Sequence, residues 1–464
     1  MMNRVVIVGG GPGGYEAALV AAQLGAEVTV VDRDGLGGSA VLTDCVPSKT
    51  LIATAELMTS IEESRELGVG SGHAENLDAV ASVDLTKINA RVQRLAMQQS
   101  DDIARKLDVE GIRVIRGTGR LNGPDSVTAT TSDGGGEVIP ADVILLATGA
   151  RPRKLPTGLP DGERILTWEQ VYDLSELPER LIVIGSGVTG AEFASAYNAL
   201  GADVVLVSSR DRVLPGEDAQ AATVLEDVLA RRGMTVLSKR RANGVTRDGD
   251  TVTVELSDGS TVEGSHCLVA VGSIPNTDGL GLEEAGVQLE EGGFAVVDRV
   301  SRTSVRGLYA AGDCTGVLML ASVAAMQGRI AMWHALGDAV KPLNLSSVSA
   351  NVFTAPEIAT VGCSQEAVDR GDVDARTEML PLAGNSRAKM QGVQDGFIKM
   401  FCRPVTGIIV GGVVVAPRAS ELIHPIAVAV ESNLTVDDLA QAFTVYPSMS
   451  GSVAEAARRL HRRS

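Results

Sequence analysis

The sequence predicts an α/β protein with two doubly wound, Rossmann-type domains followed by a smaller α+β domain. With 464 residues, the chain exceeds the ~250–300 residues at which single cores stop growing, so several domains are expected. The second observation is a repeated order of strand, glycine turn, helix and strand, which is the βαβ unit. The third is that this order does not recur after residue 345.

Each repeat places a glycine-rich turn directly after an apolar strand. The first has a strand at Arg4–Val8, a turn at Gly9–Gly14, a helical stretch to Leu24 and a strand at Glu27–Val31. The second has a strand at Leu181–Ile184, a turn at Gly185–Gly190, a helical stretch to Leu200 and a strand at Asp203–Val207. A lone GxGxxG is weak evidence, but this context is what the dinucleotide fingerprint requires. Two dinucleotide-binding domains are therefore expected.

The first glycine turn suits a pyrophosphate. Gly9 permits the tight turn, Gly11 lets the backbone approach the phosphates, and Gly14 lets the helix pack on the sheet. The helix N-terminus then offers free N–H groups and the positive end of its dipole. Asp32, at the end of the second strand, is placed to accept hydrogen bonds from an adenosine ribose. The expected contacts of this turn are Gly9, Gly11, Pro12, Gly13, Gly14, Asp32 and Arg33.

The second turn follows the same logic, with a different end to its second strand. Its expected contacts are Gly185, Ser186, Gly187, Val188, Thr189 and Gly190. Ser208, Ser209 and Arg210 stand where the first repeat has a carboxylate. Two hydroxyls and a guanidinium would bind the 2′-phosphate that an acid would repel. This site is therefore expected to accept NADPH, alongside NADH or in its place. The alternative is that Arg210 is a solvated loop cation.

The remaining segments indicate β-hairpins and a mixed C-terminal region. Residues 133–136 predict a hairpin turn, and residues 245–272 alternate like paired strands around Asp258 and Gly259. Beyond residue 345, an apolar run at 407–415 predicts a strand. The stretches 419–432 and 435–442 predict helices.

Composition excludes several classes of function. The net charge of −17 disfavours nucleic acid, because an acidic surface repels phosphate backbones. No apolar run approaches the ~18 residues of a membrane span, and the glycine-rich start does not resemble a signal peptide. A cytoplasmic location without stable membrane insertion is expected. The five cysteines are widely spaced and no metal-ligand spacing occurs, so neither a disulfide framework nor a metal site is expected.

The motifs together resemble a known family. They span nearly the whole chain and occur in the family's order: Gly9–Gly14, Gly37–Gly38, Cys45–Lys49, Ala147–Gly149, Gly185–Glu192, Gly272–Asn276, Tyr309–Asp313, Phe353–Ala359, Asn385–Ala388 and Asp395–Phe397. On these residues the chain resembles the FAD-dependent pyridine nucleotide–disulfide oxidoreductases, and within them the dihydrolipoamide dehydrogenases.

The resemblance implies domains, cofactors and a partner. Residues 1–150 and 277–345 would form the FAD-binding domain, 151–276 the NAD(P)-binding domain, and 346–464 the C-terminal dimerisation domain of a homodimer. FAD would sit on the first glycine turn. The further cofactor contacts implied by resemblance are Gly38, Ser39, Gly119, Thr148, Gly149, Gly272, Gly312, Asp313, Leu320 and Ala321.

Two departures from the family concern the disulfide chemistry. Disulfide-reducing members carry two cysteines in the stretch 38–49; here Cys45 is present, but Ala40 takes the other place. An internal disulfide relay needs two thiols within reach of each other. The family's C-terminal His and Glu are replaced by Tyr446 and Gly451. A phenol with a pKa near ~10 is a poor base at neutral pH.

The residues for hydride entry are retained. By resemblance, Lys49 lies beside the flavin N5, and Glu192 is its ion-pair partner near the nicotinamide. A cation there would stabilise negative charge on the reduced flavin. Cys45 either touches the flavin as a lone thiol or is an inert remnant of the motif. The expected catalytic residues are therefore Lys49, Glu192, Cys45 and Tyr446.

Without a disulfide, reduced FAD must pass electrons directly to a diffusible acceptor. The leading hypothesis is an NAD(P)H:quinone oxidoreductase of the diaphorase type, because small residues at Ala40 and Gly451 leave room for a ring. One alternative is a soluble pyridine nucleotide transhydrogenase. Another is a non-catalytic FAD-binding protein derived from a dehydrogenase, against which the retained Lys49 and Glu192 argue.

Overall fold

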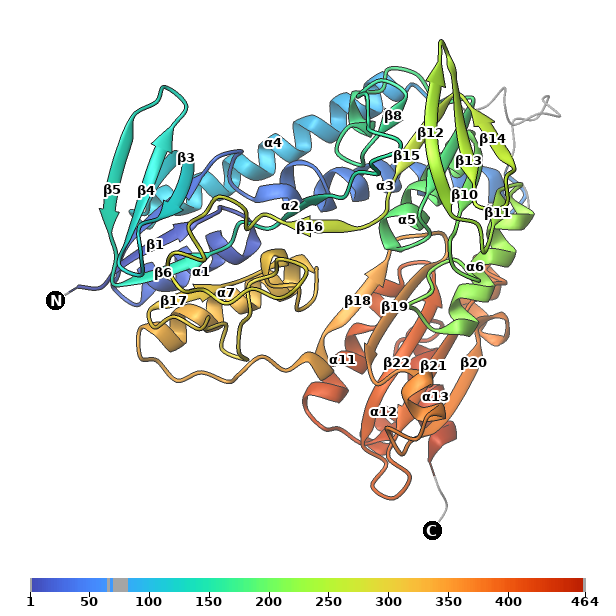
Figure 1. The fold of residues 1–464 in the computed structure, drawn as a ribbon. Helices are drawn as coiled ribbons and strands as arrows, with labels where there is room; N and C mark the ends of the chain where they lie inside the picture. The colour runs from blue at the N-terminus through green and yellow to red at the C-terminus, as the bar shows by residue number, and fades with distance from the viewer. Residues whose placement is uncertain (1, 65–66, 70–81, 462–464) are drawn as a thin grey trace. The chain divides into compact units, whose positions relative to one another are not determined.

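A computed structural model describes residues 2–64, 67–69 and 82–461 (Figure 1). The chain divides into two compact units. Unit 1 comprises Met1–Thr50, Asn89–Arg153 and Gly272–Asn344, and unit 2 comprises Leu51–Ile88, Lys154–Val271 and Leu345–Ser464. The expected NAD(P)-binding and C-terminal domains therefore fall within one unit. The expected boundaries lie within five residues of the divisions at 153/154, 271/272 and 344/345, but Leu51–Ile88, which was expected in the FAD-binding domain, is grouped with unit 2.

Unit 1 is built on a seven-stranded sheet with the order β17-β6-β1-β2-β3-β4-β5. Its strands are β1 (Arg4–Val8), β2 (Glu27–Asp32), β3 (Arg113–Leu121), β4 (Ser126–Thr131), β5 (Gly136–Pro140), β6 (Val143–Leu146) and β17 (Leu308–Ala310). The first five strands in this order pair in parallel, and β3, β4 and β5 form antiparallel hairpins. Val8 pairs with Val31 and Leu146, so the strands end at one edge of the sheet, where the first glycine turn begins.

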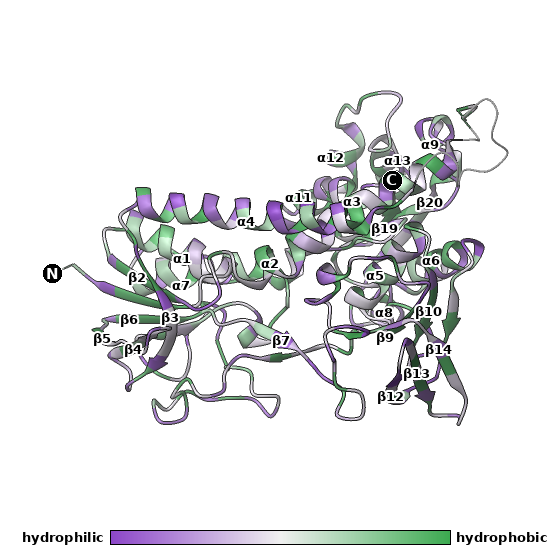
Figure 2. Cartoon of the chain, turned by 90° about the horizontal axis from the view of Figure 1, so that it is seen from above, coloured by the Kyte–Doolittle hydropathy of each residue, from purple (hydrophilic) through white to green (hydrophobic). Residues whose placement is uncertain are grey.

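Helices α1 (Pro12–Gln23), α4 (Leu85–Val109) and α7 (Ala321–Ala335) pack on this sheet through their apolar faces. Helices α1 and α7 pack against each other and against strand residues such as Ile7 and Leu145. The long helix α4 buries residues three or four apart, including Val92, Ala96 and Ile103. Figure 2 shows the resulting hydrophilic and hydrophobic bands along α4. The other elements of unit 1 are α2 (Gly38–Leu42), β7 (Ala150–Pro152), β16 (Ser273–Pro275), η3 (Asp313–Thr315) and the start of α3 (Cys45–Glu63).

The expected nucleotide-binding part of unit 2, residues 154–271, has a parallel sheet with the order β11-β10-β9-β15-β8. Its strands are β8 (Ile165–Leu166), β9 (Arg180–Ile184), β10 (Asp203–Val207), β11 (Thr235–Leu237) and β15 (His266–Val269). Helices α5 (Val188–Ala199) and α6 (Ala219–Arg231) follow β9 and β10, and η2 (Val171–Asp173) precedes β9. A separate antiparallel sheet contains β12 (Ala242–Asp248), β13 (Thr251–Leu256) and β14 (Thr261–Gly264).

The C-terminal part of unit 2 is an antiparallel sheet with the order β18-β19-β22-β21-β20, together with short helices. Its strands are β18 (Ser349–Val352), β19 (Glu357–Gly362), β20 (Arg376–Pro381), β21 (Phe397–Cys402) and β22 (Ile409–Ala416). Its helices are η4 (Leu345–Ser347), α8 (Gln365–Asp369), η5 (Leu382–Gly384), α9 (Ser386–Met390), α10 (Ala419–Leu422), α11 (His424–Glu431), α12 (Val436–Gln441) and α13 (Gly451–Leu460). Residues such as Ile398, Val414 and Ile426 form its core.

The predicted α/β architecture is confirmed, with one wrong detail. The single helix expected at 419–432 is two helices, α10 and α11. Pro425 lies in the first turn of α11, where a residue without an N–H is tolerated. In the interior of one continuous helix the same proline would remove a backbone hydrogen bond, so the helix breaks before it. Among the described residues, no helix is both long and apolar enough to cross a bilayer.

Candidate functional site

The first glycine turn is held by backbone contacts that leave no room for side chains. Gly9 has φ +106°, and a Cβ there would lie 2.2 Å from the Ala147 carbonyl oxygen. A Cβ on Gly14 would lie 1.9 Å from the Gly9 carbonyl oxygen. Gly11, between them, has only the Gly38 Cα within 4 Å of its Cβ position. The tight turn and the close helix packing expected of these glycines are both present.

The second glycine pair, Gly37 and Gly38, lies against this turn. The Gly37 N–H donates to the Gly10 carbonyl over 2.8 Å, and a Cβ on Gly38 would lie 2.8 Å from the Gly11 Cα. The result is a cradle of bare backbone at the N-terminus of the twelve-residue helix α1. Such a surface, at the positive end of a helix dipole, fits the pyrophosphate of a dinucleotide such as FAD.

Asp32 fastens the loops around this cradle. Its Oδ2 accepts a hydrogen bond from the Gly10 N–H over 2.6 Å, and its Oδ1 accepts one from the Gly35 N–H over 2.5 Å. Each oxygen keeps a second lone pair for a ribose hydroxyl. Arg33, by contrast, is exposed and forms a bidentate pair with Asp34. Ser39, on α2, is also exposed.

The segment after β17 presents a second carboxylate. Gly312 adopts φ +82°, and its N–H donates to the buried Gln327 Oε1 over 2.8 Å. Burial, followed by the negative charge of Asp44, raises the pKa of Asp313 to about 6. Leu320 and Ala321 begin α7 a few residues later. A half-buried carboxylate beside a positive-φ glycine fits the ribitol of a flavin, whose hydroxyls donate to it.

Hydrogen bonds join two motif segments, Ala147–Gly149 and Gly272–Asn276, that lie far apart in the sequence. The Thr148 hydroxyl donates to the Asn276 carbonyl over 2.7 Å, and the Asn276 side-chain amide donates back to the Thr148 carbonyl over 3.0 Å. Gly149 and Gly272 have φ values of +69° and +94°. Gly119 is different: it is buried in β3, where a Cβ would lie 2.8 Å from the Val8 side chain. Its structural role is therefore close packing.

Lys49 and Cys45 lie one turn apart on α3, on the same face of the helix. Both side chains are partly exposed. Ala40 lies in the preceding helix α2. All five cysteines belong to the described residues, and none of them is in a disulfide bond. These residues cannot form the cysteine pair on which a disulfide relay depends.

The second glycine turn repeats the geometry of the first. Gly185 has φ +111°, and a Cβ there would lie 2.1 Å from the Ala270 carbonyl oxygen. A Cβ on Gly190 would lie 1.8 Å from the Gly185 carbonyl oxygen. Gly187 has no atom within 4 Å of its Cβ position, and Val188 and Thr189 begin α5 beside it. This second cradle fits another dinucleotide pyrophosphate.

At the end of β10, the residues expected to bind a 2′-phosphate differ in their exposure to solvent. The Ser208 side chain is fully buried, with its hydroxyl 2.7 Å from that of Ser186. Its role in the structure is therefore internal. Ser209 and Arg210 are exposed. The Lys239 N–H donates to the Arg210 carbonyl over 2.7 Å, which brings a second exposed cation to this strand end.

Glu192, on α5, is 3% exposed. Its Oε1 accepts a hydrogen bond from the Phe353 N–H over 2.9 Å, and Ser195 on the same helix accepts one from the Ala355 N–H over 3.3 Å. Both bonds hold the loop between β18 and β19, within unit 2. The carboxylate is thus fixed in orientation.

Tyr446 lies on a strongly exposed segment between α12 and α13. Its side chain is 85% exposed, and those of Phe443 and Val445 are 106% and 77% exposed. Gly451 begins α13. Three large apolar side chains within four residues are unusual on the surface of a free protomer.

Sequence reasoning missed two residues that support the first cradle. Gln327 holds the Gly312 N–H, as described above. Gly328 brings α7 onto α1, since a Cβ there would lie 2.0 Å from the Gly13 carbonyl oxygen. A glycine inside a helical stretch costs stability, so its presence in α7 was an available signal of close packing.

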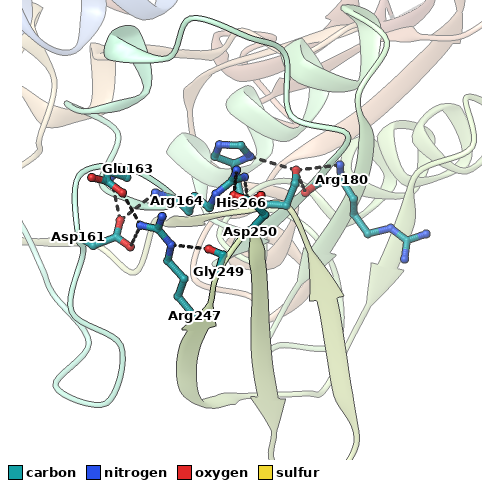
Figure 3. Close-up of polar contacts among 9 residues, drawn as sticks. Asp161, Glu163, Arg164, Arg180, Arg247, Gly249, Asp250 and His266 are labelled. Carbon is teal, nitrogen blue, oxygen red and sulfur yellow. Dashed lines mark hydrogen bonds and ion pairs between the residues drawn. The ribbon is translucent and has the colours of Figure 1, made fainter.

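Two cavities lie away from the glycine turns. One, of about 720 Å³, is lined by residues on the amino side of β17, including Arg306, Tyr309 and His334. The other, of about 560 Å³, adjoins the polar cluster of Figure 3, at the amino end of β15 in unit 2. There Arg247 contacts Asp161 and Glu163, and Arg164 pairs with Asp250. Since β9 and β15 run in parallel, this cluster lies at the edge of the sheet opposite the second glycine turn.

Comparisons with known proteins match both parts of the chain. A family profile described as pyridine nucleotide-disulphide oxidoreductase matches residues 3–328. A second profile, described as the dimerisation domain of pyridine nucleotide-disulphide oxidoreductase, matches residues 348–457.

Individual relatives match over nearly their whole length. An NAD(P)H dehydrogenase (quinone) from Mycobacterium tuberculosis is 57% identical over 99% of this chain and 94% of its own. A dihydrolipoyl dehydrogenase from Zymomonas mobilis is 32% identical over 97% of this chain and 96% of its own. The crystal structure of LpdA from M. tuberculosis has a TM-score of 0.94 and 56% identity, covering 99% of this chain and 100% of that one. The flavoprotein disulfide reductase RclA from Escherichia coli is 23% identical with a TM-score of 0.86, covering 98% of this chain and 99% of that one, and so shares the fold.

Proposed function

Because the chain belongs to the pyridine nucleotide-disulphide oxidoreductase family, we propose that it is an FAD-dependent NAD(P)H:quinone oxidoreductase. The observation that carries this proposal is the 57% identity to an NAD(P)H dehydrogenase (quinone) over nearly the whole chain. Ala40 supports it independently, because a chain that lacks one cysteine of the motif pair cannot relay electrons through that disulfide.

The two glycine cradles would divide the cofactors between them. Residues around Gly9–Gly14, Asp32 and Asp313 would hold FAD, and residues around Gly185–Gly190 would hold NAD(P)H. FAD, when bound, would take a hydride from the nicotinamide and pass electrons to the quinone. Lys49 would place positive charge at the flavin, and the buried Glu192 would orient groups at the nicotinamide. Cys45 and Tyr446 would contribute to the acceptor side.

We further propose that Arg210, with Ser209 and Lys239, binds the 2′-phosphate of NADPH. The Ser208 hydroxyl, expected from the sequence to lie beside them, is buried against Ser186 and is not part of this phosphate site. An arginine offers charge-assisted hydrogen bonds to phosphate, and a serine, Ser208, stands at the position that the Asp32 carboxylate takes in the first repeat.

Steady-state turnover tests both proposals. NADPH and NADH should each support reduction of a series of benzoquinones and naphthoquinones, with no turnover of lipoamide or glutathione disulfide. Robust lipoamide reduction without quinone activity would refute the quinone proposal.

Arg210→Ala should lower kcat/KM for NADPH by roughly ten- to a hundredfold, the effect of losing one or two charge-assisted hydrogen bonds, and leave kcat/KM for NADH nearly unchanged. Arg180→Ala is the matched control, because Arg180 begins β9 and Arg210 follows the other end of the neighbouring strand β10.

A further inference from the structure

Unit 2 contains an ion pair that is almost completely removed from solvent. The Lys399 Nζ lies 2.6 Å from the Asp218 Oδ2, and the two side chains are 1% and 3% exposed. Lys399 comes from β21 of the C-terminal sheet, and Asp218 precedes α6 of the nucleotide-binding part. The Nζ also lies 5.5 Å from the centroid of the Phe397 ring. Because burying two charges carries a large desolvation cost, such pairs are better explained by fixing a geometry than by adding stability.

The Asp218 carboxylate has a second task. Its Oδ1 caps helix α6 by accepting hydrogen bonds from the Gln220 and Ala221 N–H groups over 3.0 and 3.1 Å. One side chain therefore fixes both the start of α6 and the end of the segment before it. Lys399 in turn fixes that side chain from the C-terminal sheet.

The segment ending at Asp218 begins at the strand end proposed to bind the 2′-phosphate. We call residues 209–217 the Arg210 segment. Its middle is folded onto the second glycine turn, since the Leu214 N–H donates to the Ser186 carbonyl over 2.8 Å. The Val213 N–H donates to Glu226 Oε1 on α6 over 2.6 Å. Leu214 has φ +51°, a conformation that non-glycine residues keep only where neighbouring contacts hold them.

We infer that Lys399 is a positioning residue for nucleotide selectivity: acting through Asp218, it holds the Arg210 segment where Arg210 can meet the 2′-phosphate. The inference rests on the proposed role of Arg210. It assigns the C-terminal sheet a part in choosing between NADPH and NADH. Lys399 itself, fully buried, does not touch the nucleotide's phosphate.

Three variants separate positioning from stability. Lys399→Met removes the cation and leaves the Asp218 carboxylate buried without its partner, so the melting temperature should fall. Asp218→Asn keeps an oxygen for the α6 cap and removes the charge. Both should raise KM for NADPH roughly five- to tenfold, the effect of one weakened charge-assisted hydrogen bond, with a smaller change for NADH and for kcat. In the double variant no unpaired charge remains, so the melting temperature should recover while KM for NADPH stays high.

A second readout does not depend on NADPH. Trypsin cleavage after Arg210 or Arg212 in the FAD-loaded enzyme should be faster in Lys399→Met, in Asp218→Asn and in the double variant, because the ion pair no longer holds the end of the segment. Asp161→Asn, in the cluster of Figure 3, destabilises the same unit away from this segment and is the matched control.

The outcomes are distinct. Unchanged cleavage in Lys399→Met and Asp218→Asn overturns the inference, whatever Arg210→Ala does. Faster cleavage with an unchanged NADPH-to-NADH ratio overturns the selectivity role, as does an equal rise of KM for NADPH in Asp161→Asn. If Arg210→Ala leaves the ratio unchanged, the proposed phosphate site fails instead. Faster cleavage together with a selective rise of KM for NADPH supports the inference.

Discussion

Burial, reinforced by the charge of Asp44, raises the pKa of Asp313 to about 6. If its carboxylate accepts a flavin ribitol hydroxyl, FAD binds the ionised form best. Affinity for FAD should then be constant above about pH 7 and should fall as the pH drops below 6, by up to about tenfold per unit. Fluorescence titration of the deflavinated protein with FAD between pH 5 and 8 measures this.

Asp313→Asn provides the control for that titration. The amide does not titrate, so the variant should bind FAD more weakly at pH 7.5 and show little pH dependence below 6. A wild-type protein whose FAD affinity does not change between pH 5 and 7 would contradict the assignment of Asp313 to the ribitol.

Because of His266, in the polar cluster of Figure 3, we expect the stability of the nucleotide-binding part to fall at acid pH. Burial, with the positive charges of Arg164 and Arg247, lowers its pKa to about 4. Between pH 6.5 and 4 the unfolded chain binds a proton that the folded chain does not, so the free energy of unfolding falls as the pH drops through this window. Urea unfolding of wild type and His266→Gln should diverge there: the variant loses less stability between pH 6.5 and 4. Parallel curves would contradict the shifted pKa.

At the scale of elements, the packing of α1 on α7 depends on glycines. Gly328→Ala should improve the helix propensity of α7 by up to about 1 kcal/mol. Its Cβ, however, would lie 2.0 Å from the Gly13 carbonyl oxygen, which is backbone and must move. Overpacking of this kind costs about 1–3 kcal/mol, so the variant should have a lower melting temperature and release FAD at a lower temperature.

The matched control for Gly328 is Gly136→Ala. Gly136 begins β5, and no atom lies within 4 Å of its Cβ position. This variant should melt within a few degrees of wild type. Equal melting temperatures for the Gly328 and Gly136 variants would show that α1 and α7 adjust without cost.

The sequence predicts well those elements whose chemistry is local. The strands at Arg4–Val8 and Asp203–Val207 occur with the predicted bounds, because apolar strand and glycine turn are read from neighbouring residues. The hairpin turn at 133–136 is likewise confirmed, with Asp133 accepting from the Gly135 N–H. The break between α10 and α11 was missed, although Pro425 marks it.

Site residues follow the same division. The two glycine turns have the predicted geometry because each task belongs to one backbone position. What sequence could not supply is tertiary: Gln327 reaches Gly312 across fifteen residues, and Lys399 reaches Asp218 across 181. Ser208 shows a further limit, because the sequence does not tell whether a hydroxyl at a strand end points toward a ligand or, as here, into the protein.

For the whole molecule, the exposed segment around Tyr446 predicts a second copy of the chain as its partner. Phe443, Val445 and Tyr446 lie within the region matched by the dimerisation-domain profile, residues 348–457. Each such side chain, if buried at an interface, contributes about 1.5–3 kcal/mol. If a homodimer buries this segment, its free energy of association should depend strongly on these side chains.

Phe443→Asp combined with Val445→Asp should shift the protein from dimer to monomer, because each change replaces apolar area with a charge that would be buried without a partner. Light scattering during size-exclusion chromatography at micromolar concentration measures the mass. Val138→Asp, on β5 outside the matched dimerisation region, changes a side chain that is 62% exposed and should leave the dimer intact.

If Tyr446 serves the acceptor side of the partner subunit, the monomer should also lose quinone turnover while NADPH still bleaches its FAD. A monomer with full quinone turnover would remove Tyr446 from the acceptor site, and a variant that stays dimeric would place the interface elsewhere.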